Sequence, residues 1–222
     1  MKPYAIALYN NKGGVGKSSS VINLAYFMQK KEKRILVVDC DTQENCYHFF
    51  SIGMQNSILL PTAYERIQHT VWDRFTRLDE EDIAEYDYIL FDLPPTISPA
   101  VENILHFSDA VYVPTMLGEF EISGLKRVTD TIHRVGTRLG GIFITMYQAE
   151  NDAELLEKVR CAFQNRLLKT IIPYSKTMRE SQKAGLAIEE YFEARKVPKS
   201  QTSYKIVNAY KSLADEIMEG AT

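Results

Sequence analysis

The sequence predicts an α/β fold, a single domain with a mostly parallel sheet covered by helices on both faces. Short runs of Ile, Val and Leu, typical of strands buried on both faces, alternate with segments of helical periodicity. The 222 residues are ample for one large core, and no repeat or linker divides residues 1–222. Polar motifs follow three of the runs, at the sheet edge where ligands bind in this fold class.

The elements follow from these patterns in chain order. Residues 4–9, 35–39, 88–92, 110–114, 141–145 and 170–172 are expected to be strands because they are continuous apolar runs. The expected helices span residues 18–31, 98–107, 122–139, 153–165 and 203–218. Residues 51–86 fit least well, since they hold the only tryptophan, Trp72, and the acidic run 79–82; they are interpreted as helical.

A glycine-rich loop lies between the first strand and the first helix. Its backbone N–H groups are expected to close around phosphate oxygens, helped by the positive end of the helix. Lys17 would reach the β- and γ-phosphates, and the Ser18 hydroxyl would bind Mg²⁺. The predicted nucleotide-binding residues are Lys12, Gly13, Gly14, Val15, Gly16, Lys17, Ser18 and Ser19. This context identifies a P-loop NTPase.

The loop departs from the general phosphate-loop pattern at two positions. Asn10 replaces the usual first glycine, and Lys12 adds a second lysine. Since Lys17 already fills the lysine role, Lys12 is hypothesised to project toward the phosphates of a neighbouring subunit. The alternative is that Lys12 is simply a solvated charge.

Three aspartates are the candidates for metal binding and hydrolysis. Asp39 and Asp92 end two apolar strands, so both are expected to hold Mg²⁺ through bound water. Asp41, two residues further on, is the better candidate for positioning the attacking water. The alternative is that an aspartate at a strand end merely begins a turn.

Three stretches together resemble the ParA/MinD family of deviant Walker A ATPases. Residues 12–19 are similar to its phosphate loop, and residues 88–95 to its Walker B strand. Residues 37–43 resemble its D-x-D-P-Q pattern, with Thr42 where proline is usual. The similarity covers nearly the whole chain and is strongest to plasmid-type ParA partition ATPases without an N-terminal DNA-binding domain.

This resemblance implies a slow, Mg²⁺-dependent ATPase that acts as a switch in DNA partition. ATP would build a homodimer in which Lys12 crosses to the other subunit, so that Lys12, Lys17 and Asp41 are catalytic. The dimer would bind DNA without sequence preference, and a ParB-type centromere-binding protein would stimulate hydrolysis. Pro173 falls where the family places its adenine-side loop.

Charge gives a weaker indication of the DNA-binding surface. The net charge is −3, but residues 151–222 carry 12 Lys and Arg against 10 Asp and Glu. The family's usual arginine aligns with Thr177, so Lys176, Arg179 and Lys205 are the candidate DNA contacts. The stretch 192–199 looks like an insertion that adds further basic residues, Arg195, Lys196 and Lys199. Each of these charges alone is also consistent with an ordinary solvated surface.

Other classes of protein fit less well. A MinD-like membrane-associated positioning ATPase is the main alternative, but the C-terminal segment is acidic, and anionic lipid would repel it. The absence of a signal peptide or membrane-spanning run predicts a cytoplasmic protein. The resemblance to ParA proteins further implies association with the nucleoid when ATP is bound. Three scattered cysteines argue against an iron–sulfur protein, the length argues against an added substrate domain, and no room precedes the first strand for a helix-turn-helix.

Overall fold

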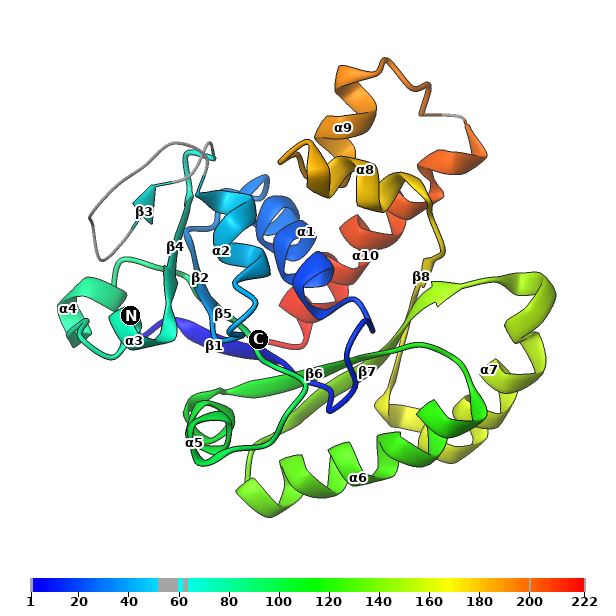
Figure 1. Ribbon diagram of the computed structural model, residues 1–222, viewed down its shortest axis with the longest axis horizontal. Helices are drawn as coiled ribbons and strands as arrows, with labels where there is room; N and C mark the ends of the chain where they lie inside the picture. The colour runs from blue at the N-terminus through cyan, green and yellow to red at the C-terminus, as the bar shows by residue number, and fades with distance from the viewer. Residues whose placement is uncertain (1, 52–59, 62–63, 200, 222) are drawn as a thin grey trace.

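The computed structural model describes residues 2–51, 60–61, 64–199 and 201–221. Within these residues, the strands form one sheet in the order β3-β4-β2-β5-β1-β6-β7-β8 (Figure 1). All pairings are parallel except that of β3 with β4, which is antiparallel and lies at the edge. The strands are β1 (Tyr4–Leu8), β2 (Ile35–Asp39), β3 (Leu60–Pro61), β4 (Ile67–Val71), β5 (Tyr88–Asp92), β6 (Ala110–Thr115), β7 (Leu139–Tyr147) and β8 (Leu167–Pro173).

Helices cover both faces of this sheet, as the sequence predicts (Figure 1). The α-helices are α1 (Lys17–Gln29), α2 (Asn45–Phe50), α3 (Trp72–Phe75), α4 (Glu80–Ile83), α5 (Pro99–Phe107), α6 (Glu119–Val135), α7 (Ala149–Phe163), α8 (Thr177–Lys183), α9 (Ile188–Ala194) and α10 (Lys205–Glu219). Short 3₁₀ turns, Gln164–Arg166 and Thr202–Tyr204, precede β8 and α10.

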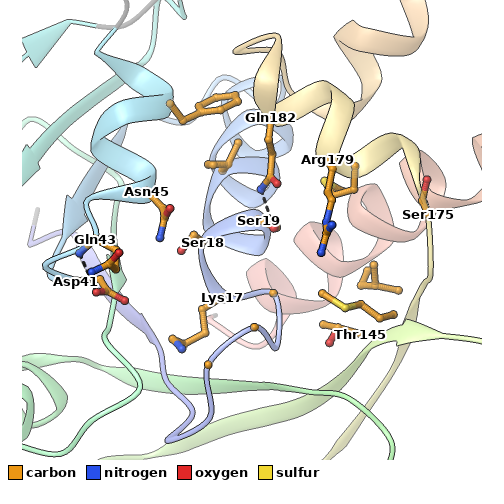
Figure 2. A pocket seen from close by; sticks show the side chains of 18 of the residues that line it. Lys17, Ser18, Ser19, Asp41, Gln43, Asn45, Thr145, Ser175, Arg179 and Gln182 are labelled. Carbon is orange, nitrogen blue, oxygen red and sulfur yellow. Dashed lines mark hydrogen bonds between the residues drawn. The ribbon is translucent and has the colours of Figure 1, made fainter.

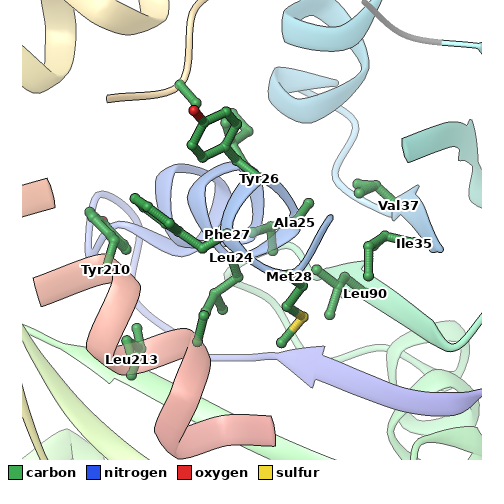
Figure 3. Packing of buried hydrophobic residues seen from close by; sticks show 14 of the residues in the cluster. Leu24, Ala25, Tyr26, Phe27, Met28, Ile35, Val37, Leu90, Tyr210 and Leu213 are labelled. Carbon is green, nitrogen blue, oxygen red and sulfur yellow. The ribbon is translucent and has the colours of Figure 1, made fainter. Parts of the chain in front are cut away.

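Alternation along β1 divides the core into two layers. Ile6 and Leu8 pack with α1, α2 and α10 on one face, whereas Ala5 and Ala7 pack with α5 and α6 on the other. This follows from the two-residue period of a strand. Helix α1 is buried on nearly all sides, because the sheet lies under it and α10 beside it (Figure 3). It therefore holds the phosphate loop on a rigid support.

The strand register determines which side chains meet at the carboxyl edge. Asp39 of β2 lies opposite Asp92 of β5, and Asp92 lies opposite Leu8, the last residue of β1. The three motifs therefore leave the sheet at the same level on adjacent strands. The prediction that they converge on one edge is confirmed.

The prediction for residues 51–86 is partly wrong. Residues 67–71 form strand β4, paired along β2, and residues 60–61 form β3; only 72–75 and 80–83 are helical among the described part of this stretch. The polar residues Gln68 and His69 interrupt the apolar run by which a buried strand is recognised, although His69 is itself buried in β4. Residues 52–59 and 62–63, which belong to the same prediction, lie outside the described residues.

Several boundaries also differ from the sequence-based expectation. Helices α6 and α7 begin three and four residues earlier than the predicted residues 122 and 153, and β7 and β8 are longer at both ends. Helices α8 and α9 have no counterpart among the expected helices, and α9 takes up the first residues of the stretch 192–199. Both helices lie above α1, on the side that faces the carboxyl edge of the sheet (Figure 1).

Candidate functional site

A cleft of about 1230 Å³ opens at the carboxyl edge of the sheet. The glycine loop, the segment after β2 and the loop after β5 form one side, and the end of β8 with α8 forms the other (Figure 2). Of the predicted site residues, those that line it are Gly13, Gly14, Gly16, Lys17, Ser18, Ser19, Asp41, Pro173, Lys176 and Arg179. Segments far apart in the sequence thus share one cavity.

The backbone of the glycine loop is shaped for an anion. Gly14 and Gly16 have φ angles of 75° and 85°, a left-handed conformation that side chains other than glycine rarely adopt. A Cβ added at Gly13 or Gly14 would meet nothing within 4 Å, so the backbone there faces open space. Gly16 caps the N-terminus of α1. The residues present therefore fit a phosphate group held by loop amides and the positive end of the helix.

Two side chains outside the glycine run fix the position of this loop. Asn10 is buried, donates to the carbonyl oxygen of Pro114 (2.8 Å) and accepts from the backbone N–H of Lys12 (3.0 Å). Thr145 on β7 donates its hydroxyl to the carbonyl oxygens of Val15 (2.9 Å) and Thr115 (3.2 Å). Asn10, the departure from the usual glycine, thus ties the loop to β6.

The two lysines of the loop have different surroundings. Lys17 is only 7% exposed, and its Nζ donates to the carbonyl oxygen of Lys12 at 3.3 Å. Burial lowers the pKa of Lys17, although the nearby carboxylates of Asp92 and Asp41 oppose this shift. Lys12 is exposed on the outside of the loop and does not line the cleft. This placement is compatible with a role for Lys12 toward a second molecule.

Asp39, Cys46 and Asp92 form a buried cluster behind the cleft, with their ligand atoms within 4.8 Å of one another. Asp39 accepts from the backbone N–H groups of Asp41 (3.0 Å) and Tyr47 (2.8 Å), so it organises the segment after β2. The thiol of Cys46 donates to Asp92 Oδ2 at 3.2 Å. Burial, followed by the charge of Asp92, raises the pKa of that thiol, which keeps it protonated as a donor.

Asp92 has the features of a residue that serves a cation. Its Oδ1 atom is buried and has no hydrogen-bond partner among the described residues. Burial raises the pKa of Asp92 to about 7, while the Ser18 hydroxyl, Cys46 and Lys17 pull it down and Asp39 adds to the rise. Such an orphaned carboxylate oxygen, beside a serine hydroxyl, fits Mg²⁺, which prefers oxygen ligands.

Asp41 faces the cleft from the loop after β2 (Figure 2). Its Oδ1 accepts the backbone N–H of Gln43 at 3.0 Å, which makes a local turn. The second carboxylate oxygen takes no part in this hydrogen bond. Asp41 is partly exposed, whereas Asp39 and Asp92 are buried. Of the three aspartates, it is therefore the one open to a water in the cleft.

The far wall of the cleft comes from the segment after β8. Pro173, Tyr174 and Ser175 begin this wall, and α8 continues it. Gln182 of α8 donates to Ser19 Oγ at 2.7 Å, which joins the two walls beside the loop. Lys176 and Arg179, grouped by the sequence with the DNA contacts, lie in this wall, whereas Lys205 is exposed at the start of α10 and does not line the cleft.

Sequence reasoning missed four residues of the site: Asn10 as a loop tie, Cys46, Thr145 and Gln182. Thr145 contacts Val15, which is 130 positions away in the sequence, and Gln182 contacts Ser19, which is 163 positions away. No local sequence pattern indicates such contacts. The spacing of Cys46 from the other cysteines predicts no metal or cluster role. Its position just after the Asp39–Gln43 motif is the one available signal.

Residues 6–188 match the family model described as the CobQ/CobB/MinD/ParA nucleotide binding domain. The chromosome-partitioning ATPase Soj of Thermus thermophilus is 30% identical, over 96% of this chain and 94% of the relative. The sporulation initiation inhibitor protein Soj of Bacillus subtilis is 26% identical, over 84% and 90% of the two chains.

Solved structures of related fold are similar along almost their whole length. An ATP complex of a Cyanothece McdA variant gives a TM-score of 0.79 at 12% identity, over 98% of this chain and 97% of the other. The septum site-determining protein MinD of Pyrococcus horikoshii, complexed with Mg-ADP, gives 0.74 at 18% identity, over 97% and 96%. These likenesses support the P-loop NTPase fold.

Proposed function

The chain belongs to the CobQ/CobB/MinD/ParA nucleotide-binding family, and from this premise we propose that it is a Mg²⁺-dependent ATPase that acts as a switch in DNA partition. One observation carries the proposal. A glycine loop open to an anion, a buried lysine and three aspartates meet at one edge of the sheet, around a cleft that is large enough for a nucleotide and that Asp41 lines.

The roles of the residues follow from their surroundings. The N–H groups of the loop and Lys17 bind the β- and γ-phosphates, and burial of Lys17 strengthens this interaction because little water screens it. Ser18, Asp39 and Asp92 hold Mg²⁺, which neutralises charge on the phosphates. Asp41, open to the cleft, positions the water that attacks the γ-phosphate. Pro173 lies on the side of the cleft that receives the base.

The switch itself rests on dimerisation. Lys12 lies on the exposed side of the loop, so in a homodimer with the two loops facing each other it reaches the partner's phosphates. The ATP-bound dimer then binds duplex DNA without sequence preference through the basic residues beside α9 and α10. A ParB-type centromere-binding protein stimulates hydrolysis and release. The similarity to Soj proteins that partition chromosomes supports this part of the proposal.

Membrane positioning, as in MinD-like proteins, is the competing function. None of the described helices is long and apolar enough to cross a bilayer. An interfacial helix would instead need a basic, apolar surface, whereas α10 ends with Asp215, Glu216 and Glu219. The acidic end of α10 therefore disfavours this helix as an anchor on anionic lipid.

Co-sedimentation separates these functions. The protein with Mg-ATP is centrifuged with either long duplex DNA on beads or vesicles rich in anionic lipid, and calorimetry measures ATP binding in parallel. We expect sedimentation with DNA only, and loss of both ATP binding and DNA binding in Lys17→Ala. Binding to vesicles but not DNA would reject partition, and unchanged ATP binding by Lys17→Ala would reject the site.

A further inference from the structure

Helix α8 presents a cationic surface to the inside of the cleft. Lys176, Arg179 and Lys183 line the wall opposite the glycine loop. Figure 2 shows the Arg179 side chain extending from α8 toward the loop and the start of α1. These three charges add to Lys17, while Asp41 is the one carboxylate among the described residues that line the cleft. The two walls together provide more positive charge than the phosphate loop alone.

Among the described residues, Arg179 and Arg195, the residue that follows α9, differ in their partners. None of the described residues forms a hydrogen bond or ion pair with its guanidinium group. Arg195, by contrast, lies 3.8 Å from Glu180 and stacks over the ring of Tyr191 at 4.6 Å. An unpaired guanidinium directed into a cleft retains all five of its donors for a ligand.

The backbone under Arg179 is held firmly against the phosphate-loop helix. Gln182, three residues on and therefore on the same side of α8, donates to Ser19 at 2.7 Å. Just beyond α8, the backbone N–H of Ile188 donates to Asn23 Oδ1 at 3.0 Å. These contacts fix α8 relative to α1, so the reach of Arg179 into the cleft is a property of the fold.

Arginine is suited to this position because its planar fork binds phosphate oxygens through two parallel N–H groups. The glycine loop and Lys17 already serve the β- and γ-phosphates. Arg179 approaches from the wall that begins at Pro173, the side to which the proposed function assigns the base. In a nucleotide bound this way, the phosphates nearest the ribose lie between Arg179 on one wall and the glycine loop with Lys17 on the other.

We infer that Arg179 is a nucleotide-binding residue that holds the inner, non-γ phosphates of the ligand from the wall opposite the phosphate loop. The inference rests on the proposed nucleotide-binding function. It assigns Arg179 to the nucleotide, whereas the sequence pattern assigns the same residue to DNA. A duplex is too wide to enter a cleft that a bound nucleotide fills, so an arginine directed inward is badly placed for the DNA surface.

Nucleotide titration of Arg179→Ala tests the inference. Calorimetry with Mg-ATP and with Mg-ADP should show a loss of affinity of roughly tenfold for both nucleotides, as for a lost charge-assisted hydrogen bond. Arg179→Lys should recover part of the loss. Arg127→Ala on α6 removes another exposed arginine, one outside the cleft, and should leave both affinities unchanged.

Binding of duplex DNA, measured for the same variants at saturating Mg-ATP, provides the second readout. We expect Arg179→Ala to keep the salt dependence of the wild type. The inference is overturned by wild-type nucleotide affinity in Arg179→Ala, by a loss confined to ATP, or by a flatter salt dependence with normal nucleotide binding. If the wild type itself binds neither nucleotide, the proposed function fails, and this result is distinct from a failure of Arg179 alone.

Discussion

Thr145 is a single side chain that joins three segments of the site. Its hydroxyl lies between the carbonyl oxygens of Val15 in the glycine loop and Thr115 at the end of β6. All three residues are buried, so water does not replace a lost hydrogen bond there. The glycine loop is therefore held in part by a residue near the end of β7, two strands away from β1 in the sheet.

Replacing Thr145 by Val should destabilise the protein by roughly 1–3 kcal/mol, because the shape is kept while buried carbonyls lose their donor. ATP affinity should fall as well, since the loop loses a tie. Urea unfolding and nucleotide titration measure the two effects. Thr131→Val on α6, where the hydroxyl only bonds back to Arg127, is the matched control and should change stability by less than about 0.5 kcal/mol. Equal effects in both variants would contradict the role of Thr145.

Asp41→Asn should bind ATP as the wild type does but hydrolyse it about 10²- to 10⁴-fold more slowly. An asparagine can still accept the N–H of Gln43 and so keep the turn, but it is a poor base for the attacking water. Phosphate release and nucleotide binding measured side by side separate these effects. A turnover equal to that of the wild type would remove Asp41 from the hydrolytic step.

Lys12→Ala should bind nucleotide as a monomer yet fail to form the ATP-dependent dimer, because Lys12 lies outside its own cleft. Light scattering with Mg-ATP gives the mass of the species directly. Lys211→Ala, an exposed lysine on α10, serves as the control and should dimerise normally. An intact Lys12→Ala dimer would leave this lysine as a solvated charge.

At the level of elements, buried Glu189 connects α9 to α1 and to the 3₁₀ turn that precedes α10. Its Oε2 accepts from Lys30 Nζ and from the hydroxyl of Tyr26 (3.1 Å), and its Oε1 from the hydroxyl of Tyr204 (3.4 Å). Burial by itself would raise the pKa of Glu189, but Lys30 and the two hydroxyls outweigh it, so the pKa lies below its usual value. The carboxylate is thus favoured by the fold.

Glu189→Gln should cost about 1–2 kcal/mol of unfolding free energy at neutral pH. Because the folded pKa is lowered, the carboxylate stabilises the fold above the unfolded pKa, near 4.5, and this contribution is lost as the pH falls through the folded value. The stability gap between wild type and variant should therefore close on acidification. Urea unfolding at several pH values measures it, and a gap independent of pH would show that the charge is not responsible.

Elements with a strong apolar pattern could be predicted from sequence, and those held by distant contacts could not. β2 and β5 are buried along their whole length, and α1 is buried on nearly all sides, so local composition identifies all three. β4 contains His69, whose Nε2 lies 3.1 Å from Ser51 Oγ, a contact that makes a polar residue compatible with the core. Helix α8 buries only Ser181, and its position depends on Gln182.

The same division holds within the site. The glycine loop and the strand-end aspartates are recognisable locally, because the chemistry of phosphate and Mg²⁺ requires those residue types in that order. The wall that faces them is different. Whether Arg179 points into the cleft or toward solvent depends on how α8 docks on α1, and no spacing in the sequence reports that docking.

For the whole molecule, charge is distributed unevenly. Residues 151–222 carry a small excess of positive charge within a chain whose net charge is −3. Lys196, Lys199 and Lys205 are exposed near the start of α10, outside the nucleotide cleft. A monomer offers few such contacts, whereas a dimer presents them twice on one rigid body and gains affinity through effective concentration.

The last prediction therefore concerns the salt dependence of DNA binding. Duplex affinity should require Mg-ATP and fall with salt by a log–log slope of about −0.9 for each phosphate contacted. Replacing Lys196, Lys199 and Lys205 together by Ala should weaken binding to all duplex sequences alike and flatten the slope, because phosphate contacts carry no sequence information. Lys158→Ala on α7, which removes a lysine paired with Glu154, is the control and should keep the wild-type slope. Fluorescence anisotropy across a salt series measures this. If the triple variant keeps the slope but changes its preference among sequences, these lysines read bases, and DNA binding is not the sequence-independent contact that the charge distribution predicts.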